Sequence, residues 1–497
     1  MNMQKAYSTL AVYLVLTGAL IVVAVTVAGI SPTSFLLVGI VLSLIIPQAF
    51  RAAQGRLDLF EPLVLANIAL GVMFVGRPLA DLVTHETIHI GYDVLPTFNE
   101  ALFVALIGIV FFQLGYFAPW GAAWARRLPR PSSFHPSRAA RAGWLFFILG
   151  TLLFSGFLVN AGGIIRILLY LLEGRQPSNN DLYLSSTGYL YGGISLWAAS
   201  ALIFFVLATA GRRRGYIFPF LATTSLLLIF YGAQGTRAQM LPLVIAVPVF
   251  WYLWKSRRPK LRTLFVASMI GFALLGWMRE IRDVGKREDM LVKLGAALSA
   301  PIREAGNILT GADAEMFDSL ANELMVVPEN LAFQHGSTVT DVLIRLVPRP
   351  LWPDKPLESN DALVNTLWPV HYSKSRAAPA FSLIGAFYVD SGIITVALGM
   401  YLAGALIATL WCWLQQYRSW VTAKMIYSMG LPFVVILMRG AVPDTLARML
   451  FMFVPLVLLM LTARSHALLS GSKNLPKPPR GGARRVQAVK ARGPIAL

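Results

Sequence analysis

Five basic side chains, spread over four short segments of the chain, have the chemistry to bind a phosphate group. They are Arg237, Arg282, Arg349, Lys355 and Arg439. An arginine guanidinium stays charged at physiological pH, and its fork of N–H donors matches the oxygens of a phosphate. No acidic metal site accompanies them in the sequence, so we expect these side chains to bind an anion directly.

Two of the arginines lie in short segments of unusual composition. Arg237 closes the segment 231–237, where two glycines let backbone N–H groups approach a phosphate. Arg282 belongs to the charged run 279–287, which follows an apolar stretch. Each segment also has a simpler interpretation. Arg237 can snorkel to lipid headgroups, and the charged run can be a solvated, internally paired helix face.

Arg349 and Lys355 belong to a proline-rich string, 347–356 (VPRPLWPDKP). Because proline fixes φ and disfavours helix in the residue before it, we expect this string to be extended and to hold both cations in a rigid frame. Stiffening of a loop is the alternative reading of the prolines. For Arg439, the alternative is an ion pair with Asp444 in the same short turn.

The composition places these residues in a membrane protein. Of 497 residues, 56% are hydrophobic and only 13% are charged, whereas soluble proteins contain about 25% charged residues. This excludes a soluble enzyme, a disordered scaffold and a disulfide-stapled secreted protein. The single cysteine, Cys412, can form neither an internal disulfide nor a metal cluster.

Twelve apolar stretches have about the length of a membrane-spanning helix. The first, 8–30, is too long for a signal-peptide core of ~7–15 residues, so we interpret it as a span. The predicted spans are 8–30, 33–50, 59–76, 101–123, 142–160, 189–210, 215–232, 238–254, 262–279, 382–411, 425–438 and 445–463. The predicted fold class is therefore an all-α polytopic membrane protein.

The net charge of +19 is explained by topology. With twelve spans, the basic segments 126–141, 212–214, 255–262 and 418–424, and the tail after residue 463, all fall on one side. The positive charge of these segments together exceeds the net charge of the whole chain. Short cytoplasmic loops are rich in lysine and arginine, so both termini are predicted to be cytoplasmic. The charge therefore gives no reason to expect binding to nucleic acid.

The predicted spans divide the chain into four parts. These are helices 1–9 in residues 1–278, a large outer loop in 279–381, helices 10–12 in 382–463, and a basic disordered cytoplasmic tail in 464–497. A loop of such length in a compact protein is usually functional. Apolar residues recur at helical spacing over 317–325 and 339–346, which predicts two helices of the loop that pack on the membrane domain.

The six histidines are scattered and do not suggest a metal centre. His85 and His89 have the i, i+4 spacing that could bind a metal from one helix face, but their segment is short and polar. An exposed loop is the favoured interpretation of that segment.

Four motifs stand out against this topology. Asp58–Pro62 (DLFEP) opens the third span and Arg77-Pro78 closes it; Gly235-Thr236-Arg237 forms a turn; 347–356 is the proline string; and Ser382–Tyr388 (SLIGAFY) leads into the tenth span. With these motifs, and in topology over nearly its whole length, the chain resembles the Wzy-type O-antigen and oligosaccharide repeat-unit polymerases of bacteria. Where many members of that family carry an acid after the glycine of the last motif, this chain has Ala386.

The resemblance implies a metal-independent glycosyltransferase of the GT-C type in the bacterial plasma (inner) membrane. Such an enzyme transfers a growing glycan from undecaprenyl diphosphate to a sugar hydroxyl on the next lipid-linked repeat unit, at the outer face, with no cofactor. The product would be an O-antigen, as in lipopolysaccharide, or an exopolysaccharide. A chain-length regulator and a flippase of the same pathway are the expected protein partners.

Two chemical needs follow from this implied reaction. The five basic residues named above would hold the diphosphate and stabilise its charge as it leaves. A base would take the acceptor proton, and the candidates are His335 and Glu323 in the large loop.

Two other functions fit the same topology. An O-antigen ligase would use the same lipid donor with a different acceptor. A polysaccharide or lipid transporter would tend to show internal repeats and broken helices near the midplane, and no repeated halves are visible in this sequence.

Overall fold

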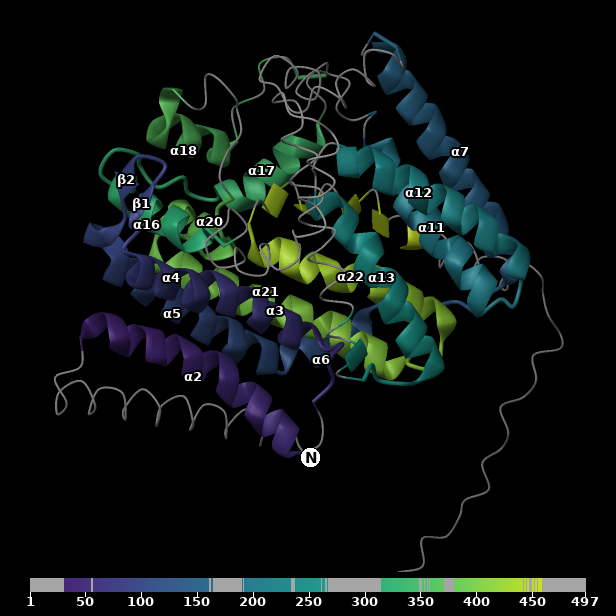
Figure 1. The fold of residues 1–497 in the computed structure, drawn as a ribbon, viewed down its shortest axis with the longest axis horizontal. Helices are drawn as coiled ribbons and strands as arrows, with labels where there is room; N and C mark the ends of the chain where they lie inside the picture. The colour runs from purple at the N-terminus through teal and green to yellow at the C-terminus, as the bar shows by residue number, and fades with distance from the viewer. Residues whose placement is uncertain are drawn as a thin grey trace, which may run out of the picture.

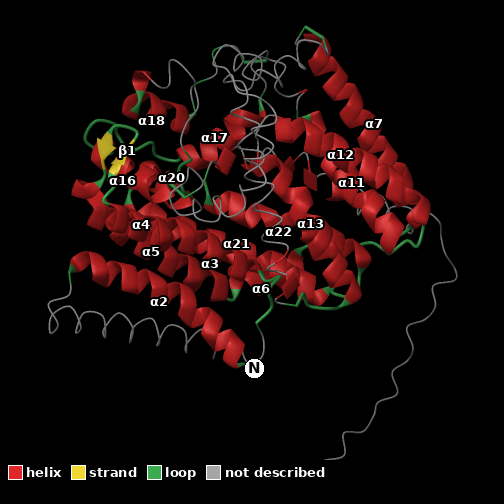
Figure 2. Ribbon diagram, in the orientation of Figure 1, coloured by secondary structure: helices red, strands yellow, loops and turns green. Residues whose placement is uncertain are grey.

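A computed structural model describes most of the chain. The described residues are 31–54, 57–160, 192–233, 237–260, 314–347, 358–370 and 380–440, with a few isolated residues and short stretches beside them. Within this part, helices dominate and one two-stranded hairpin, β1 (Ile88–His89) and β2 (Tyr92–Asp93), pairs antiparallel (Figure 2). The protein is an all-α membrane protein.

Seven helices among the described residues are long and apolar enough to cross a membrane. They are α2 (Pro32–Ala53), the continuous helix Pro62–Thr84, η2 (Leu95–Thr97) with α5 (Phe98–Phe117), α7 (Pro136–Asn160), η4 (Arg214–Tyr216) with α12 (Ile217–Ala233), α21 (Ile393–Gln416) and α22 (Val421–Met438). Two further apolar helical segments are shorter: α11 (Gly193–Thr209), and the part Gln239–Lys255 of α13 (Arg237–Lys255). Of the predicted spans, 8–30, 262–279 and 445–463 lie wholly or largely outside the described residues.

Several predicted boundaries are wrong. The stretch 101–123 runs past the end of α5 at Phe117 into α6 (Trp120–Arg127). The stretch 382–411 is two helices, α20 (Leu383–Ser391) and α21, separated at Gly392, whose φ of 74° interrupts the helix. The third span continues past residue 76, because α3 (Pro62–Gly71) passes through a π-helical turn (Val72–Gly76) directly into α4 (Arg77–Thr84). Arg77 therefore lies inside a helix and is buried.

Three of the predicted basic segments, 126–141, 255–262 and 418–424, meet at one end of the bundle. Asp58, before α3, lies 3.7 Å from Arg258 and 3.9 Å from Arg418, measured from a carboxylate oxygen to a guanidinium nitrogen. The indole of Trp413 donates to the backbone oxygen of Pro129 at 3.1 Å, which brings the segment after α6 (Trp120–Arg127) to the same place.

The opposite end carries the loop elements. Figure 1 shows α16 (Met316–Val326), α18 (Ser359–Leu367), α20 and the hairpin gathered at the left, where α4 ends and α5 begins. The two predicted loop helices are confirmed as α16 and α17 (Ser337–Leu346). One large apolar core joins α16 and α20 to α2, α3, α5 and α21, so this part of the loop packs on the membrane helices as predicted.

Candidate functional site

Helix α16 is a short helix with an unusually polar interior face. Asp318, Ser319, Asn322 and Glu323 are all buried, although they are polar or charged. Apolar contacts fix the helix in place: the ring of Phe317 packs edge-on against Phe98 of α5, with centroids 4.7 Å apart. The helix therefore carries carboxyl groups into the space between the loop and the membrane helices.

Glu323 is the buried carboxyl group of this helix that lacks any hydrogen bond. Its exposed fraction is 0%, and neither side-chain oxygen has a hydrogen-bond partner. Among the described residues, the other buried carboxylates each have at least one hydrogen bond or ion pair. Burial raises the pKa of Glu323 well above its usual range. An unpartnered buried carboxyl group with a raised pKa is typical of functional sites.

The first turn of α20 makes room for this carboxyl group. Ser382 caps the helix by accepting a hydrogen bond from the backbone N–H of Gly385 at 2.9 Å. A Cβ atom on residue 385 would come within 2.7 Å of Oε1 of Glu323. A side chain at position 385 would therefore have to displace the carboxyl group of Glu323.

A small polar cavity adjoins Glu323. The volume that the centre of a water-sized sphere can occupy in it is about 20 Å³. This leaves room for about one water molecule. Its walls come from α16, α17, α18, α20 and the segment after α22; the polar lining residues besides Glu323 are Ser337, Thr338, Asp341, Ser359 and Asn360. Four short helices thus converge on one carboxyl group, three from the large loop and α20 from the start of the membrane segment that follows it.

Two of the neighbouring carboxylates position these helices. Asp341 of α17 accepts hydrogen bonds from the backbone N–H of Ser359, at 2.8 Å, and from its hydroxyl, at the start of α18. Asp390 of α20 accepts from the hydroxyl of Ser337 and the backbone N–H of Thr338, both at 3.2 Å, at the start of α17. Because a carboxylate stabilises a helix N-terminus, both residues hold the cavity walls in place.

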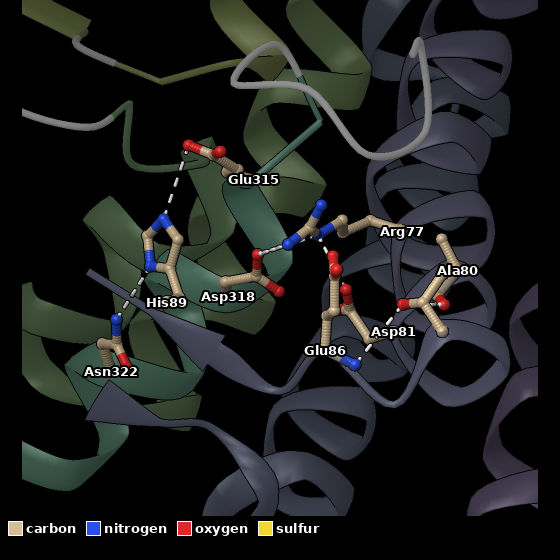
Figure 3. Close-up of polar contacts among 9 residues, drawn as sticks. Arg77, Ala80, Asp81, Glu86, His89, Glu315, Asp318 and Asn322 are labelled. Carbon is tan, nitrogen blue, oxygen red and sulfur yellow. Dashed lines mark hydrogen bonds and ion pairs between the residues drawn. The ribbon is translucent and has the colours of Figure 1, made fainter. Parts of the chain in front are cut away.

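A buried ion network ties the same helix to the third span. Figure 3 shows Arg77 of α4 facing Asp318 of α16 and Asp81 of its own helix. Its Nε donates to Asp318 at 2.8 Å and lies 3.0 Å from Asp81, and Nη2 is also 2.8 Å from Asp318. The π-helical turn just before Arg77 changes the register of the helix at the point where this guanidinium must face α16.

His89 does not lie in an exposed loop, as the sequence suggested; the hairpin buries it. Its Nδ1 accepts from the side-chain amide of Asn322 at 3.0 Å, and its Nε2 faces Glu315 at 3.4 Å (Figure 3). His85, by contrast, is exposed. Within the described residues, no group of three or more His, Cys, Asp or Glu side chains could hold a metal ion.

The two base candidates lie at opposite ends of α20. Glu323 faces Gly385 in its first turn, whereas Nδ1 of His335 lies 2.8 Å from the hydroxyl of Ser391, the last residue of the helix. His335 is exposed and does not line the cavity. The structure therefore separates the two residues, and only Glu323 belongs to the cavity.

Of the candidates for binding a diphosphate, Arg439 has a described side chain. It is half-buried at the C-terminus of α22. The next residue, Gly440, packs directly against the backbone of Phe381 and Ser382, and Val442 lines the cavity. This turn therefore lies beside the start of α20. The backbone of Arg237 begins α13, but its side chain, and Arg282, Arg349 and Lys355, lie outside the described residues, as does Asp444.

The sequence alone indicates Glu323 as a candidate but not the residues that position it. It marks Arg77 only as the end of a span, and it gives no indication of a role for Asp318, Asp341 or Asp390. The signal that could have indicated Asp318 is the sequence of α16, in which Asp318, Ser319, Asn322 and Glu323 interrupt an otherwise apolar segment. Arg77, Asp341 and Asp390 lie on other helices, and no local sequence pattern marks them as neighbours of Glu323 or Asp318.

Comparison with known proteins found no relative of this chain. No family model, curated protein or solved structure matches the chain. The function must therefore be inferred from the site itself and from the motifs.

Proposed function

We propose that the protein is a polysaccharide polymerase that transfers a growing glycan from undecaprenyl diphosphate to the next lipid-linked oligosaccharide repeat unit. The reaction would take place at the outer face of the bacterial plasma membrane, on a GT-C-like fold of about twelve spans with both termini in the cytoplasm. The motif resemblance supports this proposal. The observation that carries it is the unpartnered buried carboxyl group of Glu323 beside a polar cavity, at the end of the bundle away from the basic loops.

In the proposed reaction Glu323 is the general base. The acceptor hydroxyl oxygen forms a bond to the anomeric carbon of the donor, the bond from that carbon to the diphosphate oxygen breaks, and the hydroxyl proton passes to the carboxylate of Glu323. A raised pKa makes the ionised carboxylate a stronger base. A cavity with room for one water allows transfer directly or through a single water molecule.

The leaving diphosphate requires positive charge that is already in place. Arg439 lies in the turn beside α20, and Arg237, Arg282, Arg349 and Lys355 are the further candidates for this role. Preorganised cations stabilise the charge that develops on a departing phosphate oxygen. In this proposal no metal ion is involved.

The proposal is tested by polymer length in cells in which variants of the full-length chain replace the wild type. Glu323→Gln removes the base while keeping the shape of the side chain, and should abolish long polymer because general-base catalysis contributes ~10²–10⁴-fold. Glu329→Gln, at an exposed acid just after α16, is the matched control. His335→Ala should leave long polymer in place, since this residue lies outside the cavity. Protein levels are compared by immunoblot.

The chemical nature of the product separates the alternatives. A polymerase yields longer glycan still attached to undecaprenyl diphosphate. Glycan attached to another acceptor would indicate a ligase, and flux of lipid-linked units into vesicles without any change in glycan length would indicate a transporter. Normal polymer in the Glu323→Gln variant would contradict the assignment of this residue.

A further inference from the structure

An open groove lies at the opposite end of the molecule from Glu323, between α7 and the turn that follows α11. Figure 1 shows α7, α11 and α12 packed together at the right. The groove has a volume of about 600 Å³, and its lining includes Arg141, Trp144, Leu145, Ile148, Arg213 and Tyr216. Arg141 and Arg213 belong to two of the basic segments that the topology predicts to be cytoplasmic.

Aromatic packing gives the groove a fixed shape. Phe204 of α11 is fully buried, and the rings of Trp144 and Tyr216 pack against it with centroids 5.1 and 5.9 Å away. Ser200 of α11 donates to the backbone oxygen of Gly143 at 2.8 Å, which fixes the close approach of α11 to α7. The two helices are therefore held together directly beneath the groove.

The mouth of the groove carries unopposed positive charge. The side chains of Arg141 and Arg213 are exposed, and neither forms an ion pair within the described part of the chain. No acidic residue occurs in 124–144 or in 205–220. The backbone at Arg213 is fixed, because its N–H donates to Leu207 at 3.0 Å across the C-terminus of α11. Two guanidinium groups on rigid elements thus flank one opening.

The wall below the charges is apolar. Leu145 and Ile148 follow Arg141 along α7 and are 59% and 53% exposed. A helix rises 1.5 Å per residue, so this wall extends roughly 10 Å from the charged mouth. Trp144, with its amphipathic ring, lies between the charged and the apolar parts, as tryptophan does at a membrane interface. The groove therefore changes from cationic to apolar along the direction of the spans.

We propose that this groove binds an anionic phospholipid, with the phosphate between Arg141 and Arg213 and an acyl chain along Trp144, Leu145 and Ile148. A free phosphate ion would use the two arginines alone and would leave the apolar wall uncovered. A zwitterionic lipid would cover the wall, but its headgroup would bring a positive ammonium group close to the two guanidinium groups, which repel it. Basic pockets between membrane helices are known to bind acidic headgroups. The site is independent of the proposed polymerase chemistry.

The test uses native mass spectrometry of the full-length, detergent-purified protein titrated with phosphatidylglycerol or with phosphatidylcholine of the same acyl chains. The variant Arg141→Gln/Arg213→Gln removes both cations of the groove. The control variant Arg127→Gln/Arg130→Gln removes the same charge from exposed positions at the same end that do not line the groove. Size-exclusion chromatography and circular dichroism establish that each variant is folded.

We expect the wild type and the control to prefer phosphatidylglycerol, and the groove variant to lose about tenfold in that preference. Arg141→Lys/Arg213→Lys should retain most of it, because the charge remains. An equal loss in the control would mean that general surface charge attracts the lipid, and no loss in the groove variant would mean that the lipid binds elsewhere; both overturn the proposal. Displacement of phosphatidylglycerol by inorganic phosphate at millimolar concentration would also overturn it, in favour of a free-anion site.

Discussion

The carboxyl group of Glu323 lies against the backbone of Gly385, so that a Cβ atom on residue 385 would be only 2.7 Å from Oε1. The two residues belong to different helices, α16 of the large loop and α20 at the edge of the membrane domain. The fit between these helices therefore depends on the absence of a single side chain. The contact also places the carboxyl group of Glu323 at the first turn of α20, where the chain's own residue 386 is alanine and not an acid.

Gly385→Ala tests this contact. The added methyl group must displace the buried carboxyl group or separate α16 from α20, and overpacking of this kind costs about 1–3 kcal/mol. We expect thermal unfolding of the purified protein in detergent to shift to lower temperature. Polymer length should shorten in parallel, because the base is displaced.

Gly71→Ala is the matched control for that substitution. Gly71 is also helical, but a Cβ atom there would meet only the side chain of Leu44 at 3.7 Å, an ordinary contact. Alanine in this helix should be neutral or stabilising by up to about 1 kcal/mol. If Gly385→Ala is tolerated as well as Gly71→Ala, the contact with Glu323 does not constrain residue 385.

Glu323→Gln should raise stability with a defined pH dependence. Because the pKa of Glu323 is raised in the folded chain, the folded state binds the proton more tightly than the unfolded state does. Below the unfolded pKa of about 4.5, the carboxyl is protonated in both states and wild type and variant should be similar. As the pH rises above this value, the wild type loses stability that the neutral amide does not lose.

The difference is measured as the unfolding temperature of both proteins between pH 4 and pH 9. We expect the variant to be more stable by about 1–3 kcal/mol at pH 8, a typical effect for a buried unpartnered group. A difference that is constant over the whole pH range would show that Glu323 does not titrate differently on folding.

Arg77→Leu should destabilise the protein strongly. It would leave Asp318 and Asp81 buried without their cation, and breaking one partner of a buried ion pair costs about 3–5 kcal/mol. The double variant Arg77→Leu/Asp318→Leu should recover part of this loss. Arg127→Leu, at an exposed arginine, should change stability by no more than about 0.5 kcal/mol. Equal effects of Arg77→Leu and Arg127→Leu in thermal unfolding would contradict the role of the network.

Arg237→Ala and Arg349→Ala test two arginines of the proposed diphosphate site, one in the turn Gly235-Thr236-Arg237 and one in the proline string 347–356. Loss of one preorganised cation next to a leaving group should lower the rate by roughly 10²–10³-fold, which should be visible as short or absent polymer at unchanged protein level. Arg127→Ala removes an arginine from the opposite end of the bundle and should leave polymer length unchanged. Long polymer in both test variants would remove these two residues from the site.

Hydropathy and periodicity were sufficient to predict most of the architecture. The helical membrane fold, α16 and α17 within the large loop, and the packing of α16 on the membrane helices all follow from the order of apolar and polar residues along the chain. These features are local, since a helix and its apolar face are properties of one segment. Hydropathy did not predict the break at Gly392, because the apolar pattern continues across it.

The site depends on contacts that no segment encodes alone. Residue types made Glu323 one of two candidate bases, but only packing against Gly385 and the cavity walls distinguishes it from His335. Likewise, hydropathy ended the third span before Arg77, whereas the structure buries that side chain because Asp318, distant in sequence, neutralises it. Burial of a charge requires a partner, and the partner is brought close only by tertiary folding.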